Sequence, residues 1–333
     1  MAEVSLHDIS KSFGAQVALK NVSITIPDGA FVVLLGPTGA GKTTTLRLIS
    51  GLETPDSGQI RIGGQDVAGL TPAQRNVAMV FQQYSLYPHL TVRENLAFPL
   101  KSPLLRTPPD EIARKIGEVA EILQISDKLD NRATELSGGE MQRVSIGRAL
   151  VRNPQIHLMD EPLSSLDAKL RSDLRIELKR IQASLGATLL YVTHDQTEAM
   201  TMATHVGVLD RGRLVQFGTP REIYEAPVSI YAASRLGSPR INILPASLFP
   251  GAPAGAASIG LRPEHIHLGE GQPARVVRVE HLGDQTRLHL RMAGSDLVTL
   301  TETHTALGKG DTIAIAPRNP LYFNADGNRL KQE

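Results

Sequence analysis

Residues 36–43, GPTGAGKT, have the residue types and the spacing of a loop that holds phosphate groups. Backbone N–H groups of such a loop surround phosphate oxygens, and its glycines let the backbone bend and approach closely. Lys42 is then predicted to reach the β- and γ-phosphates, and the Thr43 hydroxyl to bind Mg²⁺. The alternative is a glycine turn that merely precedes a lysine. The predicted nucleotide contacts from this loop are Gly36, Pro37, Thr38, Gly39, Ala40, Gly41, Lys42, Thr43 and Thr44.

A second candidate element is residues 156–161, IHLMDE, where a short apolar run ends in two carboxylates. In layered α/β proteins, ligands bind at the carboxyl ends of the strands. Asp160 is predicted to hold Mg²⁺ directly or through water, and Glu161 to act as the general base for a water molecule. An Asp-Glu pair in an ordinary turn is the alternative, which the upstream phosphate loop disfavours. His157 interrupts the strand, and we expect a hydrogen-bonded histidine without a function.

The turn LSGGE at residues 136–140 precedes a helical pattern. Ser137 and Glu140 have the spacing of a capping box, which alone could explain both residues. Two consecutive glycines additionally expose helix-start N–H groups to a ligand. Because the chain has its own lysine loop, this second phosphate site is predicted to serve a nucleotide held by another subunit. Its residues are Ser137, Gly138, Gly139 and Glu140.

The sequence around these motifs has predicted strands that alternate with predicted helices. This alternation predicts an α/β domain with a largely parallel sheet. The helix after the lysine loop should end at Gly51, and an amphipathic helix should run from about 170 to Gly186. Residues 91–153 have a mostly helical pattern. The predicted strands are 22–26, 31–35, 76–81, 156–160, 188–192 and 206–209.

The sequence changes character after about residue 235. Residues 245–260 are rich in Pro, Ala and Gly, which indicates a linker or a long loop. Alternating runs then predict strands at 275–279, 286–290 and 312–316, and thus a small all-β barrel of the oligonucleotide/oligosaccharide-binding (OB) type. The expected domains are 1–235, with a helical subdomain at about 88–153, and 236–333.

The composition of the chain excludes some kinds of chemistry and disfavours some kinds of partner. The 333 residues contain no cysteine, which excludes disulfides, thiolate metal sites and cysteine nucleophiles. A formal net charge of +1 gives no electrostatic argument for nucleic acid. The first residues lack a signal-peptide pattern, and no apolar run is long enough to cross a bilayer. We therefore expect any contact with a membrane to be indirect, through a partner.

The three motifs, in this order over residues 1 to about 235, resemble the Walker A, Walker B and signature motifs of ATP-binding-cassette (ABC) ATPases. The resemblance implies an α/β P-loop NTPase domain with a helical subdomain. It also implies ATP and Mg²⁺ as cofactors. The signature here is LSGGE, where many relatives have LSGGQ.

The resemblance implies roles for four more residues. Phe13 would stack on adenine, with a core phenylalanine as the alternative, and Gln82 would lie near Mg²⁺ and water, with Gln83 as the alternative register. Asp167 would lie in a loop at the dimer interface, and His194 would contact the γ-phosphate. The expected catalytic residues are Lys42, Gln82, Glu161 and His194, and the expected metal ligands are Thr43, Gln82 and Asp160.

Segments 261–265 and 279–283 resemble the transport-associated barrel of maltose-type importer ATPases, and 83–92 resembles their loop beside a coupling groove. The resemblance implies an ATPase that powers a carbohydrate, polyol or glycerol phosphate importer. Its expected partners are a second copy or a similar ATPase, two transmembrane permease subunits and, through the complex, a solute-binding protein. The expected location is the cytoplasmic face of the inner membrane.

Three other functions are weighed against this one. Polyamine and ferric ion importers use similar ATPases. A soluble cassette ATPase of translation or DNA repair is disfavoured, because the chain has one lysine loop and no sustained heptads. A non-catalytic regulator is disfavoured by the presence of Lys42, Asp160, Glu161 and His194 together.

Overall fold

The computed structural model describes residues 2–103, 105, 107–152, 154–303 and 305–331. The expected domain limits at 1, 153 and 333 lie outside these described residues. The chain separates into two compact units, Met1–Pro220 and Arg221–Glu333, whereas composition placed the boundary near residue 235. Within the second unit, the Arg262 guanidinium donates hydrogen bonds to the carbonyl oxygens of Tyr224, Ala233 and Leu236.

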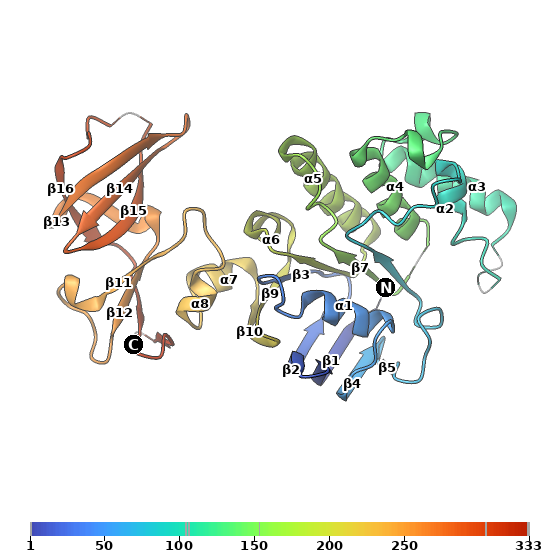
Figure 1. The fold of residues 1–333 in the computed structure, drawn as a ribbon, viewed down its shortest axis with the longest axis horizontal. Coiled ribbons are helices and arrows are strands. Elements are labelled where there is room, and N and C mark those ends of the chain that lie inside the picture. The colour runs from blue at the N-terminus through green and yellow to red at the C-terminus, as the bar shows by residue number, and fades with distance from the viewer. Residues whose placement is uncertain (1, 104, 106, 153, 304, 332–333) are drawn as a thin grey trace. The chain divides into compact units, whose positions relative to one another are not determined.

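Six strands form the central sheet of the first unit: β3 (Phe31–Leu35), β6 (Val77–Val80), β7 (Ile156–Asp160), β8 (Leu189–Thr193), β9 (His205–Asp210) and β10 (Arg213–Gly218). Their order is β10-β9-β3-β8-β7-β6 (Figure 1). All pairs are parallel except β9 with β10. Every residue of β3, β7 and β8 is buried, which explains why these strands are nearly continuous apolar runs. The parallel sheet predicted from the sequence is confirmed.

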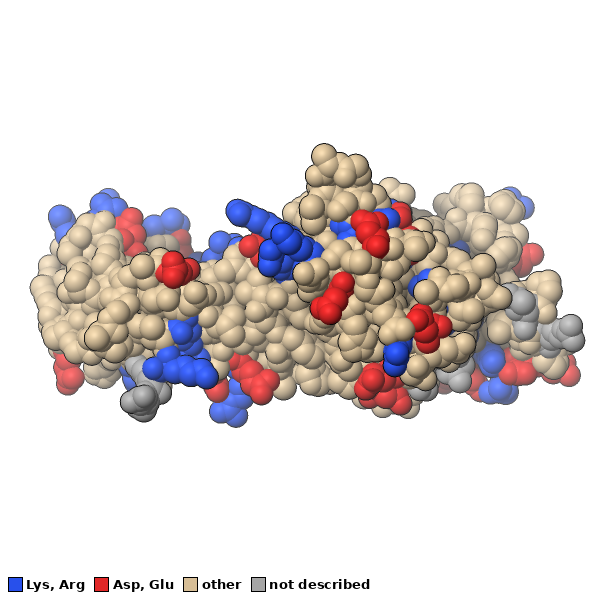
Figure 2. All heavy atoms as spheres, turned by 90° about the horizontal axis from the view of Figure 1, so that it is seen from below, with Lys and Arg blue, Asp and Glu red and all other residues tan. Residues whose placement is uncertain are grey.

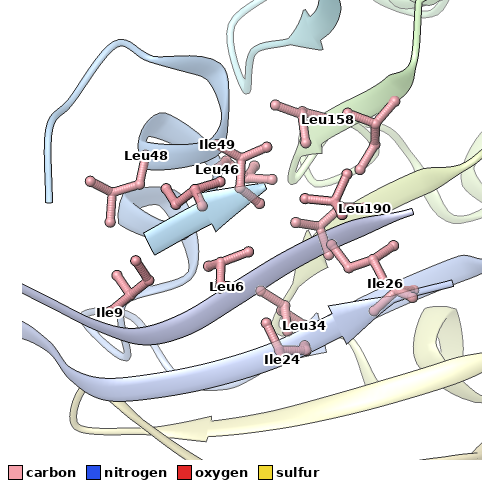
Figure 3. Packing of buried hydrophobic residues seen from close by; sticks show 14 of the residues in the cluster. Leu6, Ile9, Ile24, Ile26, Leu34, Leu46, Leu48, Ile49, Leu158 and Leu190 are labelled. Carbon is pink, nitrogen blue, oxygen red and sulfur yellow. The ribbon is translucent and has the colours of Figure 1, made fainter. Parts of the chain in front are cut away.

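An antiparallel sheet lies beside it in the order β2-β1-β4-β5, with β1 (Val4–Phe13), β2 (Gln16–Ile26), β4 (Ser57–Ile62) and β5 (Gln65–Asp66). Helix α1 (Lys42–Ser50) follows the lysine loop and ends at Gly51 in the left-handed conformation, φ 79°. Side chains of α1 and of both sheets share one apolar cluster (Figure 3), which includes Leu6, Ile24, Leu34, Leu46, Ile49, Leu158 and Leu190. This packing places the start of α1, and thus the lysine loop, relative to β7 and β8.

The other helices of the first unit are α2 (Val92–Ala97), α3 (Pro109–Ile122), α4 (Gly138–Leu150), α5 (Ala168–Leu185) and α6 (Gln196–Met202), with 3₁₀ turns at Ser126–Lys128 and Ala133–Glu135. In Figure 1, α1 lies on one side of the central sheet, and α5 and α6 lie on the other. Side chains of Thr91, Ser137, Asp167 and Asp195 accept backbone N–H bonds at the helix starts. The helical pattern at 91–153 and the end of α5 at Gly186 are confirmed.

The second unit carries two four-stranded sheets, in the orders β11-β12-β17-β18 and β15-β14-β13-β16. They pack around apolar side chains such as Leu244, Ile259, Val276, Leu288 and Ile315. The predicted small all-β unit is confirmed. The elements are α7 (Pro220–Glu225), α8 (Ile230–Ala233), β11 (Asn242–Pro245), β12 (Ser258–Leu261), β13 (Ile266–His281), β14 (Thr286–Met292), β15 (Ser295–Thr301), β16 (Thr312–Pro317), β17 (Leu321–Phe323) and β18 (Arg329–Leu330), with 3₁₀ turns at Ala246–Leu248 and Pro263–His265.

Of the two alternatives for residues 245–260, a linker or a long loop, the structure shows the long loop. It joins β11 to β12, which pair antiparallel through Leu244 and Ile259. Strand β15 was not predicted, although Leu297 and Thr299 are buried and alternate with less buried neighbours. Its inward-facing threonine weakened the apolar alternation.

The surface carries both signs of charge. Figure 2 shows acidic and basic side chains interspersed over one face of the molecule. Within the described part of the chain, no helix has the length and apolar character needed to cross a membrane.

The environment of His157 in the structure differs from the one expected from the sequence. The residue is 1% exposed, and its Nδ1 atom is buried without a hydrogen-bond partner among the described residues. Burial, aided by the charge of Arg152, lowers the pKa of His157 to about 4. The expectation of a hydrogen-bonded core histidine is therefore wrong for Nδ1.

This burial predicts a pH-dependent stability. The unfolded chain takes up a proton near pH 6.5 that the folded chain excludes until about pH 4, so stability falls as the pH is lowered through this window. Between about pH 7 and pH 4, the free energy of unfolding should fall by about 3 kcal/mol more in the wild type than in His157→Leu. Urea unfolding followed by circular dichroism measures this difference. Met159→Leu on the same strand should behave as the wild type, and equal pH dependence of wild type and His157→Leu would contradict the prediction.

Candidate active site

The carboxyl ends of the parallel strands bring the predicted site residues to one edge of the sheet. Leu35 pairs with Thr193, and Asp160 pairs with Val192. The residues that directly follow these three strands are therefore Gly36, His194 and Glu161, at neighbouring positions. Val80 pairs with Met159, so Gln82 follows β6 at the same edge, and both Gln82 and Gln83 are exposed.

Two kinds of contact hold the lysine loop in place. Lys42 forms hydrogen bonds with carbonyl groups of the loop, and Gly41 packs against β2. Lys42 is 5% exposed, and its Nζ donates to the carbonyl oxygens of Gly36 at 3.0 Å and Pro37 at 3.1 Å. Gly41 has φ 104°, and a Cβ there would lie 2.7 Å from the carbonyl oxygen of Ala18. Gly39 has φ 80° but no heavy atom within 4 Å of such a Cβ among the described neighbours. Packing thus requires glycine at 41, while only the backbone conformation favours it at 39.

Thr43 and Asp160 form a pair of oxygen donors beside the loop. The Thr43 hydroxyl donates to Asp160 Oδ1 at 3.0 Å. Burial raises the pKa of the Asp160 carboxyl, and the hydrogen bond from Thr43 opposes that rise. Oxygen donors of this kind fit Mg²⁺, which proteins hold through one or two carboxylates together with substrate phosphates. In the described residues no cluster of three or more His, Cys, Asp or Glu could hold a metal, so nucleotide phosphates would have to supply further ligands.

Glu161 occupies a constrained position at the centre of the site. Its φ is 45°, in the left-handed region, and its N–H donates to the Val192 carbonyl at 3.1 Å. Its carboxylate lies 3.4 Å from Lys42 Nζ through Oε1 and 3.0 Å from His194 Nδ1 through Oε2. The structure therefore joins Lys42, Glu161 and His194 by direct contacts.

The structure contains a buried hydrogen-bonded pair that the sequence did not reveal, formed by residues on either side of His194 in the chain. Tyr191 on β8 donates from its hydroxyl to Glu198 Oε2 on α6 at 2.9 Å. Burial raises the pKa of Glu198. The bond joins the middle of β8 to α6, and His194 lies in the short connection between these two elements. The sequence did not indicate this pair, because Tyr191 lies in an apolar run and could not be told from the core residues around it.

The signature turn is held by its own capping box. Ser137 Oγ accepts from the Glu140 N–H at 3.3 Å, and Glu140 Oε2 accepts from the Ser137 N–H at 2.8 Å. The N–H and the hydroxyl of Ser137 both donate to the Glu140 carboxylate and, together with Lys128 Nζ at 3.6 Å, lower the pKa of this carboxyl. The predicted capping box is confirmed. One of its hydrogen bonds is accepted by the carboxylate of Glu140, which is the negative charge that distinguishes LSGGE from LSGGQ.

The two glycines of this turn have a packing reason that the sequence did not reveal. A Cβ at Gly139 would lie 2.1 Å from Leu170 Cδ2, and one at Gly138 would lie 3.2 Å from the Tyr84 hydroxyl. The Tyr84 hydroxyl also lies 3.3 Å from Ser165 Oγ. Asp167 caps α5 by accepting from the Leu170 N–H at 3.0 Å. The signature turn and the loop before α5 are thus neighbours.

Phe13 lies at the end of β1 with 45% of its surface exposed, and Lys11 Nζ lies 5.2 Å from its ring centroid. The alternative that Phe13 is a core residue is therefore wrong. An exposed aromatic ring remains available for stacking.

Comparisons with known proteins agree with this geometry. A family model described as ABC transporter matches residues 19–164, and a model described as TOBE domain matches residues 259–320. An sn-glycerol-3-phosphate import ATP-binding protein, UgpC, of Ruegeria pomeroyi is 44% identical over 335 residues, which cover 95% of each chain. The chain belongs to the ATP-binding subunits of ABC transporters. It is an ATP-binding, ATP-hydrolysing enzyme of an importer, and the family resemblance read from the three motifs is confirmed.

A further sequence relative and a solved structure also resemble this ABC ATPase. A UgpC of Rhizobium meliloti is 45% identical over 353 residues, covering 99% of this chain and 100% of the relative. The dimeric structure of a bacterial ABC transporter cassette matches with a TM-score of 0.59 at 31% identity, covering 66% of this chain and 99% of that chain. The importer relatives span both units, and the cassette spans two thirds of the chain.

The two loop glycines provide a matched test of the packing argument. Gly41→Ala and Gly39→Ala both place a side chain at positive φ, but only Gly41→Ala brings a Cβ against a backbone oxygen. We expect Gly41→Ala to lower the free energy of unfolding by about 1–3 kcal/mol more than Gly39→Ala does. Urea unfolding without nucleotide separates this effect from phosphate binding. Equal losses in the two variants would refute the packing requirement at 41.

Proposed function

We propose that this ABC ATPase powers the import of sn-glycerol 3-phosphate or a closely related carbohydrate or polyol. Support comes from relatives named for sn-glycerol-3-phosphate import that are 44–45% identical over at least 94% of the chain. The cargo itself contacts other subunits, so no residue of this chain selects it directly. Polyamine and ferric ion importers remain the alternatives that an uptake experiment distinguishes.

The observation that carries the catalytic proposal is the position of the Glu161 carboxylate, 3.4 Å from Lys42 Nζ and 3.0 Å from His194 Nδ1. Glu161 accepts a proton as a water oxygen attacks the γ-phosphorus and the bond to the β-phosphate oxygen breaks. Lys42 balances negative charge on the β- and γ-phosphates, and His194 contacts the γ-phosphate. Gln82 orients the water from the adjacent strand end.

Thr43, Asp160 and Gln82 are the proposed ligands of Mg²⁺. When bound, the ion would balance negative charge on the β- and γ-phosphates. The Thr43–Asp160 hydrogen bond of 3.0 Å keeps two of these side chains next to each other. Backbone N–H groups of residues 36–44 and the start of α1 bind the phosphates, and Phe13 stacks on the adenine.

We propose that two copies assemble head to tail. One chain carries two phosphate sites of different kinds, the lysine loop and the turn Ser137–Glu140, and each ATP would lie between one site of each kind. Asp167, which caps α5 beside the signature turn, would lie at the same interface. The dimeric cassette that matches this chain supports this arrangement. A related ATPase in place of the second copy would form the same two sites.

The partners on the membrane are proposed to be two permease subunits, which also connect the ATPase to a solute-binding protein. A hollow of about 710 Å³ near α2 offers them an apolar surface, lined by residues that include Ala73, Phe98, Pro99 and Leu105. Phe98 is 51% exposed, and its ring centroid lies 4.4 Å from that of Tyr87, in the segment 83–92. Exposed apolar surface of this kind favours a protein partner. Such docking would hold the chain at the cytoplasmic face of the inner membrane.

The two domains predicted from the sequence would have different roles. Residues 1–235 would supply the ATPase and its helical subdomain, and residues 236–333 would form a transport-associated regulatory domain that includes the TOBE match.

Replacing the proposed base tests the mechanism. Glu161→Gln keeps the shape but cannot accept the proton, so ATP turnover should fall by roughly 10²–10⁴-fold. ATP binding should persist and the closed dimer should accumulate, as measured by an ATPase assay and by size-exclusion chromatography with ATP. Glu121→Gln, an exposed carboxyl on α3, is the control. Unchanged turnover in Glu161→Gln would show that another group is the base.

Replacing one aromatic side chain tests the docking surface. Phe98→Glu places a charge in the hollow, so affinity for the permease should fall by about tenfold or more, while the ATPase activity of the isolated protein persists. Co-purification with the permease measures the loss. Ile176→Glu alters another exposed apolar residue, on α5, and should co-purify normally. Normal co-purification of Phe98→Glu would place the docking surface elsewhere.

Uptake measurements test the cargo. Cells that express this chain with its neighbouring permease and binding-protein genes should accumulate labelled sn-glycerol 3-phosphate, and Glu161→Gln should abolish the accumulation. Labelled putrescine and ferric ion serve as competing substrates. Uptake of either of them in place of glycerol phosphate would overturn the proposed cargo and leave the ATPase mechanism intact.

A further inference from the structure

A cavity of about 350 Å³ lies in the first unit, away from the proposed ATP site. It is bounded by α3, the end of α4, the start of β7 and the end of α5. Its apolar wall consists of Val119, Ile122, Leu150, Val151 and Leu185. The volume lies within the range of roughly 300–1,000 Å³ that is typical of small-molecule sites.

Two buried nitrogen atoms belong to side chains that line this cavity and have no hydrogen-bond partner among the described residues. They are Nδ1 of His157, a residue that is 1% exposed, and Nε of Arg152. The Arg152 guanidinium otherwise donates at 3.4 Å to two neutral oxygens, those of Val77 and Asn76. Buried polar groups in proteins almost always have partners, so unpartnered nitrogens in two side chains that line a cavity indicate a missing partner. The Arg152 Nε–H can only donate, and it therefore lacks an acceptor.

The charges around the cavity favour an anion as that acceptor. The charge of Arg152 helps to lower the pKa of the His157 imidazole. Of the other charged side chains that line the cavity, Glu118 is paired with Arg114 at 2.7 Å and Lys115 is paired with Glu111 at 3.0 Å. Arg152 has only neutral hydrogen-bond partners among the described residues.

We propose that this cavity binds a small amphipathic carboxylate. The carboxylate head would contact Arg152 and His157, and the hydrocarbon body would contact the apolar wall. A charge-assisted bond to a guanidinium is among the stronger hydrogen bonds in proteins, and burial of the hydrocarbon adds to it.

The position of the cavity connects it to the ATP site. Helix α4 begins at the signature turn and ends at Leu150, while β7 begins at Ile156, next to His157, and ends at Asp160. A ligand in the cavity would therefore contact the far ends of the two elements that carry the signature turn and the catalytic carboxylates. Occupancy is expected to change ATP turnover through these two elements.

Hexanoate is a suitable probe, and hexanol is its uncharged counterpart. The full chain, labelled with ¹³Cε1-histidine, is titrated with each compound, and the His157 resonance is assigned by its loss in His157→Leu. Hexanoate should shift this resonance saturably, and hexanol should bind about tenfold more weakly. Equal binding of both compounds, or no saturable shift, would overturn the proposal, and the latter result would indicate that water alone fills the cavity.

Variants test the head-group contact. Arg152→Gln removes the charge and should weaken hexanoate binding by about tenfold, whereas Arg143→Gln, which replaces an arginine of α4, should bind normally. Unchanged binding in Arg152→Gln would also overturn the proposal. If Arg152→Gln fails to fold, His157→Leu should lose hexanoate binding in a saturation-transfer experiment, with Met159→Leu as the control. Saturating hexanoate should change ATP turnover of the wild type at least about twofold, and unchanged turnover would refute the connection to the ATP site.

Discussion

Parallel pairing of β3, β8 and β7 determines where the chemistry can occur. The register places the residues after Leu35, Thr193 and Asp160 side by side. The positively charged Lys42 and the carboxylate of Glu161 then meet at 3.4 Å, although they are far apart in the chain. A shift of one residue in one strand would move a side chain to the opposite face and separate the group. The buried apolar side chains of these strands hold the register.

Around this edge, most polar groups already have partners within the chain. Thr43 donates to Asp160, Tyr191 donates to Glu198, and Ser137 and Glu140 bond to each other. Such bonds fix side chains before any ligand arrives, so little reorganisation is needed when ATP binds. Near the start of β7, away from this edge, the buried Nδ1 of His157 has no partner among the described residues.

Much of the first unit could be predicted, because its signals are local. Apolar runs marked β3 and β7, Gly186 marked the end of α5, and the capping box marked the start of α4. The predictions failed where the cause lay in contacts between elements. Strand β15, for example, depends on pairing with β14.

The sequence by itself determined the phosphate loop, the paired carboxylates, the signature turn and hence the class of enzyme, because each motif is a short run whose residue types suit one chemistry. Tertiary structure alone decided three other matters. It showed that Gly41 is required by the carbonyl of Ala18, that Phe13 is exposed, and that His157 faces a cavity with Arg152. These facts depend on which distant atoms come within contact distance, and packing between elements, not the local residue pattern, sets those distances.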